Sequence, residues 1–153
     1  MASTPRDVAR DLARLIRGEI EVRDFPWLSD KERRALGALG MSMLRSGKAG
    51  VAKAAFGVLI DLEPDAAVHH LMFGHASALS DEVQLAFRSF GKAISLAAAD
   101  ERNREVASEA FLARGDLLLR LGRTVEARAD MADAATRMKD PGRRRSIEAF
   151  LAA

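Results

Sequence analysis

The feature that most constrains this fold is a set of small and aromatic residues that recurs at a fixed interval. A glycine, an alanine and a phenylalanine each return 34 residues later, giving the pairs Gly40/Gly74, Ala52/Ala86 and Phe56/Phe90. Self-similarity at one period indicates that the chain is built from copies of one supersecondary unit, each of which must stack on a neighbour to bury its apolar face. The sequence therefore predicts a repeat protein.

The residue types in the first copy indicate a helical hairpin. Gly40 has no side chain, so it would let two antiparallel helices approach closely, and Ala52 is the small residue on the second helix. We predict that Phe56 fills the space toward the next repeat, and that Pro64 ends the second helix because proline cannot continue one. This spacing is typical of the tetratricopeptide repeat, a helix-turn-helix unit of about 34 residues.

A third copy follows after a longer interval. Gly115, Ala127 and Met131 each lie 41 residues after their counterparts in the second copy. Seven extra residues are about two helical turns, so the insertion could lengthen a helix while nearly preserving the orientation of its apolar face. We place the insertion in the polar run 99–105.

Capping signals set the predicted helix boundaries. Thr4 with Asp7 and Ser29 with Glu32 have the spacing of capping boxes, and Asp140 precedes Pro141 at the start of the last helix. We detect no alternating apolar–polar run long enough for a strand. The predicted helices cover residues 4–17, 30–45, 50–62, 65–79, 81–97, 100–121, 124–138 and 141–151.

The predicted fold class is therefore all-α: a helical-hairpin solenoid with three tetratricopeptide-like repeats, an N-terminal helix and a C-terminal capping helix. We divide the chain into an N-terminal helix and connector, residues 1–28, and a three-repeat domain with its capping helix, residues 29–153.

Composition narrows the classes of function. The chain has no cysteine, so it has no disulfide, no thiolate metal site and no cysteine nucleophile. We detect neither an apolar run of membrane-spanning length nor the apolar core of a signal peptide, and we expect a cytoplasmic protein that does not insert into membranes. The net charge is only +2. We interpret two sets of basic residues as solvated faces, because no nucleic-acid-binding motif accompanies them. They are residues 143–145, and Arg6, Arg10, Arg14 and Arg17 along the first helix.

No set of residues indicates catalysis. No two of His69, His70 and His75 have the i,i+4 spacing that would bring two imidazoles to one metal, so we predict no metal site. We find no glycine-rich phosphate loop and no nucleophile–base pair, so we predict neither a cofactor nor enzymatic activity. Four acidic residues stand at the ends of predicted helices: Glu63, Asp65, Asp81 and Glu82. A carboxylate at the start of a helix interacts favourably with the helix dipole.

The repeat phase also predicts a binding groove, because the first helix of each hairpin lines the concave side of such a solenoid. An apolar groove with polar edges is typical of a peptide site. The alternative is that some of these residues are core, or are covered by the N-terminal segment. Asp116 could contact a ligand backbone or could pair with Arg114 or Arg120. The predicted groove residues are Arg34, Gly37, Met41, Leu44, Val68, Leu71, His75, Ala78, Glu109, Leu112, Asp116 and Leu119.

The chain from about Val8 to Leu151 resembles the class II chaperones of bacterial type III secretion systems. The resemblance rests on the segments LARLIRGEIEVRDFPWLS and LGMSMLRSGKAGVAKAAFGVLIDLEP, on two further repeats, and on a short last helix, RRRSIEAFLAA. The chain departs from that family in having no tyrosine, in its basic pI near 9.4 and in its seven-residue insertion. These departures bear on the identity of the cargo more than on the fold.

The resemblance implies a bacterial cytoplasmic chaperone that binds a hydrophobic, secreted translocator-like protein as an extended segment. Two other classes remain: a generic repeat scaffold that joins two folded proteins, and a nucleic-acid-linked regulator that uses the arginine-rich ends. Family members often dimerise through the N-terminal segment, which implies a weak homodimer here, whereas docking on the chain's own first repeat is the alternative. The apolar residues of that segment are Val8, Leu12, Leu15, Ile16, Val22, Phe25, Trp27 and Leu28.

Overall fold

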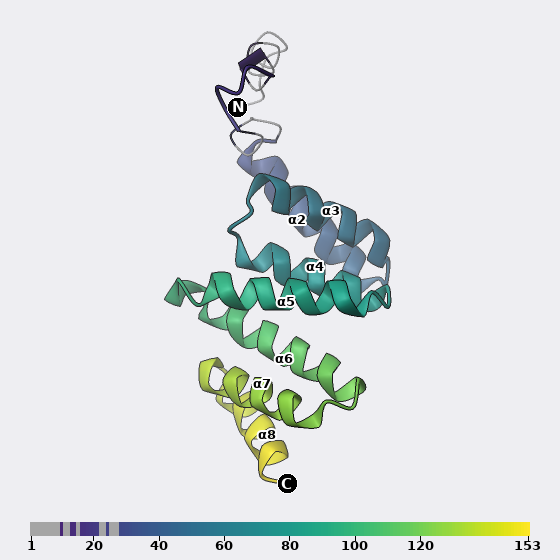
Figure 1. The fold of residues 1–153 in the computed structure, drawn as a ribbon, viewed down its shortest axis with the longest axis vertical. Helices are drawn as coiled ribbons and strands as arrows, with labels where there is room; N and C mark the ends of the chain where they lie inside the picture. Colours follow the sequence, from purple (N-terminus) through teal and green to yellow (C-terminus); the bar gives the residue numbers. More distant parts are fainter. Residues whose placement is uncertain (1–9, 11–12, 15, 22–23, 25–27) are drawn as a thin grey trace. The chain divides into compact units, whose positions relative to one another are not determined.

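The computed structural model describes residues 10, 13–14, 16–21, 24 and 28–153, and within these residues the regular structure is helical with no strand (Figure 1). The chain forms two compact units, residues 1–64 and 65–153. The predicted division after residue 28 stays a prediction. The first unit contains α2 (Asp30–Arg45) and α3 (Ala49–Leu62); the second contains α4 (Ala67–Leu79), α5 (Val83–Ala97), the short 3₁₀ helix η2 (Glu101–Asn103), α6 (Arg104–Arg120), α7 (Thr124–Arg137) and α8 (Pro141–Ala152).

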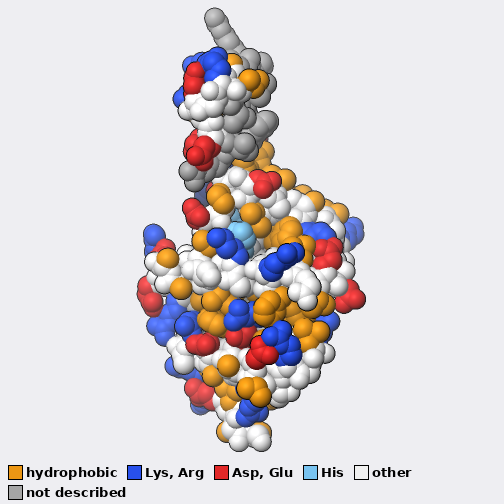
Figure 2. Space-filling model, in the orientation of Figure 1, with side chains coloured by type: hydrophobic (Ala, Val, Ile, Leu, Met, Phe, Trp, Pro, Cys, Tyr) orange, Lys and Arg blue, Asp and Glu red, His pale blue; other side chains and the backbone are white. Residues whose placement is uncertain are grey.

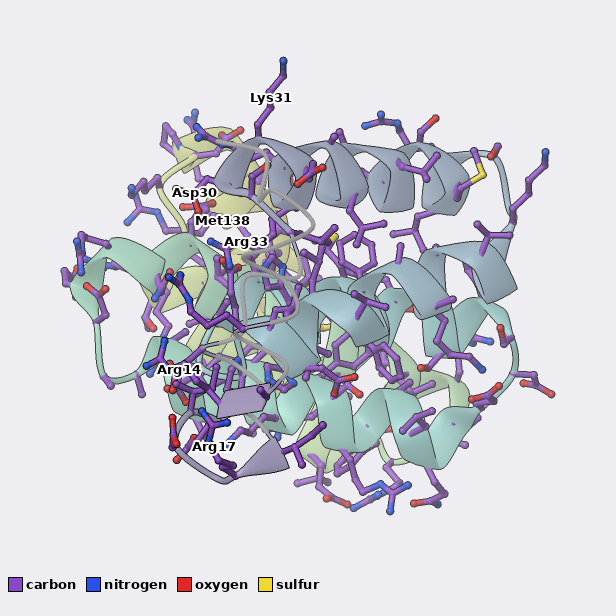
Figure 3. All side chains as sticks on the ribbon, turned by 90° about the horizontal axis from the view of Figure 1, so that it is seen from above. Arg14, Arg17, Asp30, Lys31, Arg33 and Met138 are labelled. Carbon is purple, nitrogen blue, oxygen red and sulfur yellow. The ribbon has the colours of Figure 1, made fainter. Side chains whose placement is uncertain are left out.

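The start of α2 has the side-chain hydrogen bonds that the sequence predicted. Ser29 and Glu32 form the predicted capping box: the Ser29 N–H donates to Glu32 Oε2 at 2.7 Å, and the Glu32 N–H donates to Ser29 Oγ at 3.3 Å. Arg33 pairs with Asp30 in the same turn and lies 3.3 Å from Glu63 Oε1 at the end of α3. Figure 3 shows Asp30 and Arg33 together while Lys31 points away. These bonds fix the point at which the chain enters the first hairpin.

One contact closes each of the three hairpins. In each case a large side chain of the second helix lies where the glycine of the first helix would otherwise carry its Cβ. An added Cβ would approach to 2.8 Å, 2.6 Å and 3.2 Å of that side chain in the three hairpins. Phe56 covers the glycine of its own hairpin, and its predicted role toward the next repeat stays a prediction. The three contacts are Gly40–Phe56, Gly74–Phe90 and Gly115–Met131, each spanning 16 residues.

The core of the second unit lies between α4, α5 and α6, with α7 packed on α6 and α8 packed on α7 (Figure 1). Three of its six buried members are alanines, which lets the helix backbones pack closely around the larger side chains. The buried members of this cluster are Leu71, Ala86, Phe90, Ala93, Ala110 and Leu117.

The seven-residue insertion lengthens a helix only in part: α6 has 17 residues, whereas its counterpart α4 has 13. Asp100 adopts an extended conformation, and its carboxylate accepts the Arg102 N–H at 3.0 Å, which begins the 3₁₀ turn η2 rather than an α-helix. The α-helix starts only at Arg104. An aspartate that bonds its own following backbone competes with helix formation, and this local bond accounts for the difference.

Most other boundaries agree with the prediction within two residues. Asp140 caps α8 as expected, accepting the N–H groups of Gly142 and Arg143 at 2.8 and 3.1 Å. α4 and α5 begin two residues later than predicted, and neither has a side-chain cap. Most of the predicted first helix, including Thr4 and Asp7, lies outside the described residues.

Candidate functional site

The predicted binding residues of the second unit lie on α4 and α6, the first helices of their hairpins, which contact each other directly. On α4, Val68 is 41% exposed. On α6, Leu112 and Leu119 are partly buried and Asp116 is exposed. Positions 109, 112 and 116 follow at intervals of three and four residues, so they form one stripe along the helix. This stripe and the exposed side of α4 are the candidate binding face of the second unit.

Two of the predicted residues on α4 belong to the core instead. Leu71 is only 2% exposed and packs within the central cluster, and Ala78 is partly buried against the same cluster. Their neighbour Leu79 is 59% exposed. The exposed side of α4 therefore lies further around the helix than we predicted, because Leu71 packs against the small residues of the central cluster. We correct the candidate set by removing Leu71 and Ala78.

The predicted residues of the first unit lie on α2. Arg34 is exposed, and its Nε–H donates to the Asp30 carbonyl at 3.2 Å. Met41 and Leu44 are partly buried, as is Gly37. α2 therefore presents part of its apolar surface at the positions that the repeat phase predicts.

Polar groups from three helices meet on the candidate face of the second unit. Arg143 of α8 donates to Glu109 Oε1 of α6 at 2.6 Å. The negative charge of Glu109 acts on His75 of α4. The His75 ring lies edge-on to the Phe90 ring, with centroids 5.3 Å apart. Burial lowers the pKa of His75 below its ordinary value, and the opposing attraction of Glu109 is the smaller effect. At neutral pH, His75 is therefore an uncharged group that both donates and accepts hydrogen bonds.

Asp116 makes no hydrogen bond or ion pair with the described residues, which is a correction to the pairing that we considered. Arg114 turns instead to Asp130 of α7 and donates two hydrogen bonds, Nε to Oδ2 at 2.7 Å and Nη2 to Oδ1 at 2.8 Å. These bonds raise the pKa of Arg114. Asp116 thus keeps an exposed carboxylate on the candidate face.

A row of alternating arginine and phenylalanine side chains was not predicted from the sequence. Each guanidinium lies over a neighbouring ring at a distance typical of cation–π contacts. Arg123 and Arg114 lie 5.6 and 5.5 Å from the Phe87 ring, and Arg114 and Arg137 lie 5.6 and 4.7 Å from the Phe111 ring. The only signal in the sequence is that both phenylalanines fall outside the repeat positions. This row joins α5, α6 and α7.

The described part of the chain contains no cluster of three or more metal-ligating side chains. None of its helices combines the length and apolar character that a bilayer crossing requires.

These helices and faces define a class of fold, the tetratricopeptide-like helical-hairpin stack, and two solved structures share it. One is the Yersinia enterocolitica type III secretion translocator chaperone SycD, with a TM-score of 0.68, 18% identity, and coverage of 90% of this chain and 94% of that one. The other is a type III secretion complex from Aeromonas hydrophila, with a TM-score of 0.69, 17% identity, and coverage of 94% and 91%. The chain thus resembles type III translocator chaperones in fold, as the sequence motifs predicted. No protein-family model matches the sequence, and no curated protein matches it.

Proposed function

We propose that this protein is a non-enzymatic secretion chaperone of the bacterial cytoplasm that binds a hydrophobic, translocator-type protein. The observation that carries the proposal is the fold shared with a translocator chaperone over about nine-tenths of both chains. The departures noted above, no tyrosine, a basic pI and a seven-residue insertion, bear on which cargo is bound more than on the shared fold.

The chemistry of the candidate face suits an extended cargo segment. Val68, Leu112 and Leu119 offer apolar contacts, and Glu109 and Asp116 offer acceptors for the backbone N–H groups of a peptide. Burying apolar cargo side chains on this face would prevent them from associating with one another. The polar groups would fix the direction and register of the segment, as in other peptide sites.

The test is co-expression of the chain with candidate cargo proteins encoded beside it, followed by a pull-down. Val68→Glu or Leu112→Glu places a charge on the apolar part of the face and should reduce binding by at least about tenfold, because an unpaired carboxylate resists burial. Val125→Glu is the matched control, since Val125 is 84% exposed and lies on α7. All three variants should keep the wild-type helix content by circular dichroism.

The identity of the partner decides between the functions considered. A partner with membrane-spanning segments that binds through the candidate face supports the chaperone. A folded, water-soluble partner would replace it with a scaffold. Binding to DNA or RNA that falls steeply with salt would indicate a nucleic-acid regulator. Unchanged affinity in both glutamate variants would move the cargo site off this face.

We propose further that the N-terminal segment forms a weak homodimer. Ile16 is 77% exposed, and Arg10, Ala13 and Arg14 are helical, but an isolated helix of this length is marginal in water and gains stability by docking. Of the other apolar residues named for this segment, only Leu28 lies among the described residues, where it is partly buried. Sedimentation of the full chain against a version lacking residues 1–28 tests the dimer. A full chain that stays monomeric well above micromolar concentration contradicts it, and a truncated chain that still dimerises moves the interface to the repeats.

A further inference from the structure

The second unit contains a pocket that the chaperone proposal does not use. It has a volume of about 560 Å³, within the range of ligand-binding pockets. Its lining residues belong to the end of α5, η2, the start of α6 and the end of α7, and Figure 1 shows where these elements lie. Apolar groups form part of its wall and charged groups the rest. Figure 2 shows hydrophobic side chains in this part of the molecule with Lys and Arg side chains beside them. The lining residues are Ile94, Ala97, Ala98, Glu101, Arg104, Ala107, Phe111, Thr136 and Arg137.

The seven-residue insertion builds one side of this pocket. Glu101 and Arg104 both fall in the run 99–105, and they pair with each other at 3.2 Å. Arg104 Nη2 also donates to the Thr136 carbonyl at 2.7 Å, which ties the insertion to α7. The 34-residue spacing of the first two repeats lacks these residues, so hairpin packing does not require them.

Arg137 is held in place but keeps donors available. Its Nη1 donates to the Asp133 carbonyl at 2.7 Å and to Asp133 Oδ1 at 2.8 Å, and its guanidinium lies 4.7 Å from the Phe111 ring. Toward the described residues its Nε and Nη2 donate no hydrogen bond. The Phe111 ring also contacts the Arg114 guanidinium, at 5.6 Å. A guanidinium fixed in this way beside an apolar wall can bind a carboxylate with little loss of conformational entropy, because its orientation is already set.

The pocket lies away from the candidate binding face. On α6 it uses positions 104, 107 and 111, whereas the candidate face uses 109, 112 and 116. At 100° per residue, the two sets are separated by roughly 140° around the helix. α5 and α7, which supply the remaining walls, are the second helices of their hairpins.

We propose that this pocket is a second binding site, which takes an apolar side chain of a partner protein together with a neighbouring carboxylate. The apolar group would contact Ile94 and Phe111, and the carboxylate would accept hydrogen bonds from the free edge of Arg137. The geometry of Arg137 supports this occupant: Glu101 pairs with Arg104 and Asp133 with Arg137 Nη1, while Arg137 Nε and Nη2 donate to no described residue and can bind a carboxylate. A short segment with leucine or phenylalanine between acidic residues has this chemistry.

The probe is a fluorescein-labelled nonapeptide with a central Leu-Phe pair flanked by two glutamates, titrated with the full chain and followed by fluorescence anisotropy. Two control peptides replace the glutamates with glutamine or the Leu-Phe pair with Ser-Ser. We expect saturable binding of the probe and at least about fivefold weaker binding of each control, because each loses one of the two contacts.

Paired variants locate the site on the chain. Arg137→Gln should weaken probe binding about tenfold, the size expected for a lost charge-assisted hydrogen bond, whereas Arg120→Gln removes an exposed charge on α6 and should change nothing. Ala98→Trp fills the pocket from an exposed position and should abolish binding, whereas Ala99→Trp, also exposed but outside the lining, should not. Equal affinity in Ala98→Trp and wild type, or no saturable binding of the probe, would overturn the proposal whatever the fate of cargo binding.

Discussion

Replacing Gly74 with alanine tests the contact that closes the second hairpin. In most helix interiors this change stabilises a protein by about 1 kcal/mol, because alanine is the better helix former. Here the new Cβ would lie 2.6 Å from Phe90 Cε1 and 2.7 Å from Cδ1. Ordinary carbon–carbon contacts are about 3.5–4.0 Å, so the ring must move by roughly 1 Å. Phe90 is 1% exposed, so its ring is enclosed by the protein and can move only if its neighbours move. We therefore expect an overpacking cost of about 1–3 kcal/mol.

Gly91→Ala is the matched control in the same unit. Gly91 lies inside α5, and its added Cβ would meet only Arg114 Nη1, at an ordinary distance of 3.8 Å. The gain in helix propensity is common to both variants and cancels in the comparison. The difference between their free energies of unfolding therefore measures the overpacking alone, and we expect Gly74→Ala to be the less stable variant by about 1–3 kcal/mol.

The assay is urea unfolding followed by helical circular dichroism, with free energies from linear extrapolation. Adding Phe90→Leu to Gly74→Ala should give back part of the loss, because the smaller side chain leaves room for the new methyl group. Gly74→Leu should be more damaging than Gly74→Ala. If Gly74→Ala stabilises the chain as much as Gly91→Ala does, the close glycine–aromatic packing and the repeat phase built on it are refuted.

Three further outcomes follow from side chains already described. Arg114→Met leaves the buried Asp130 carboxylate unpaired and should lower the free energy of unfolding by about 2–4 kcal/mol, and adding Asp130→Leu should restore most of it in urea unfolding. Because burial lowers the pKa of folded His75, the unfolded state binds more protons as pH falls below about 6.5, so stability should decrease from there down through the folded pKa. His75→Gln should flatten that decrease between pH 7.5 and 5.5 in urea midpoints, with His70→Gln as control, and an unchanged slope would contradict it. Asp140→Ala removes the cap of α8 and should cost about 1 kcal/mol in thermal unfolding.

Local signals made the hairpins predictable. The capping box at Ser29 and the cap at Asp140 act on backbone groups within three residues, so they could be recognised from the sequence alone. The glycine and phenylalanine positions were informative because each contact recurs at the same spacing. In the first case the interaction is local in the sequence, and in the second it recurs at one spacing, so a pattern in the sequence can reveal both.

Interactions between non-repeating positions were not predictable in this way. Arg114 bonds Asp130 on another helix, 16 residues away, whereas its nearest carboxylate in the sequence, Asp116, points elsewhere. Leu71 has the helical spacing of a face residue, but the small side chains around it decide that it is buried. The insertion shows the same limit: it lengthens α6 relative to α4, but a bond from Asp100 makes residues 101–103 a 3₁₀ turn instead of a further turn of α-helix.

The 16-residue span of the three glycine contacts bears on how the chain reaches its folded state. Each hairpin closes a short loop, and loops of this size close in well under a microsecond, so no hairpin has to wait for distant parts of the chain. Proteins dominated by such local contacts fold quickly, and stacked repeats can begin folding at any copy. The contact between α2 and α3 can therefore begin to form while the ribosome is still adding the residues of α8, and stacking of the repeats follows.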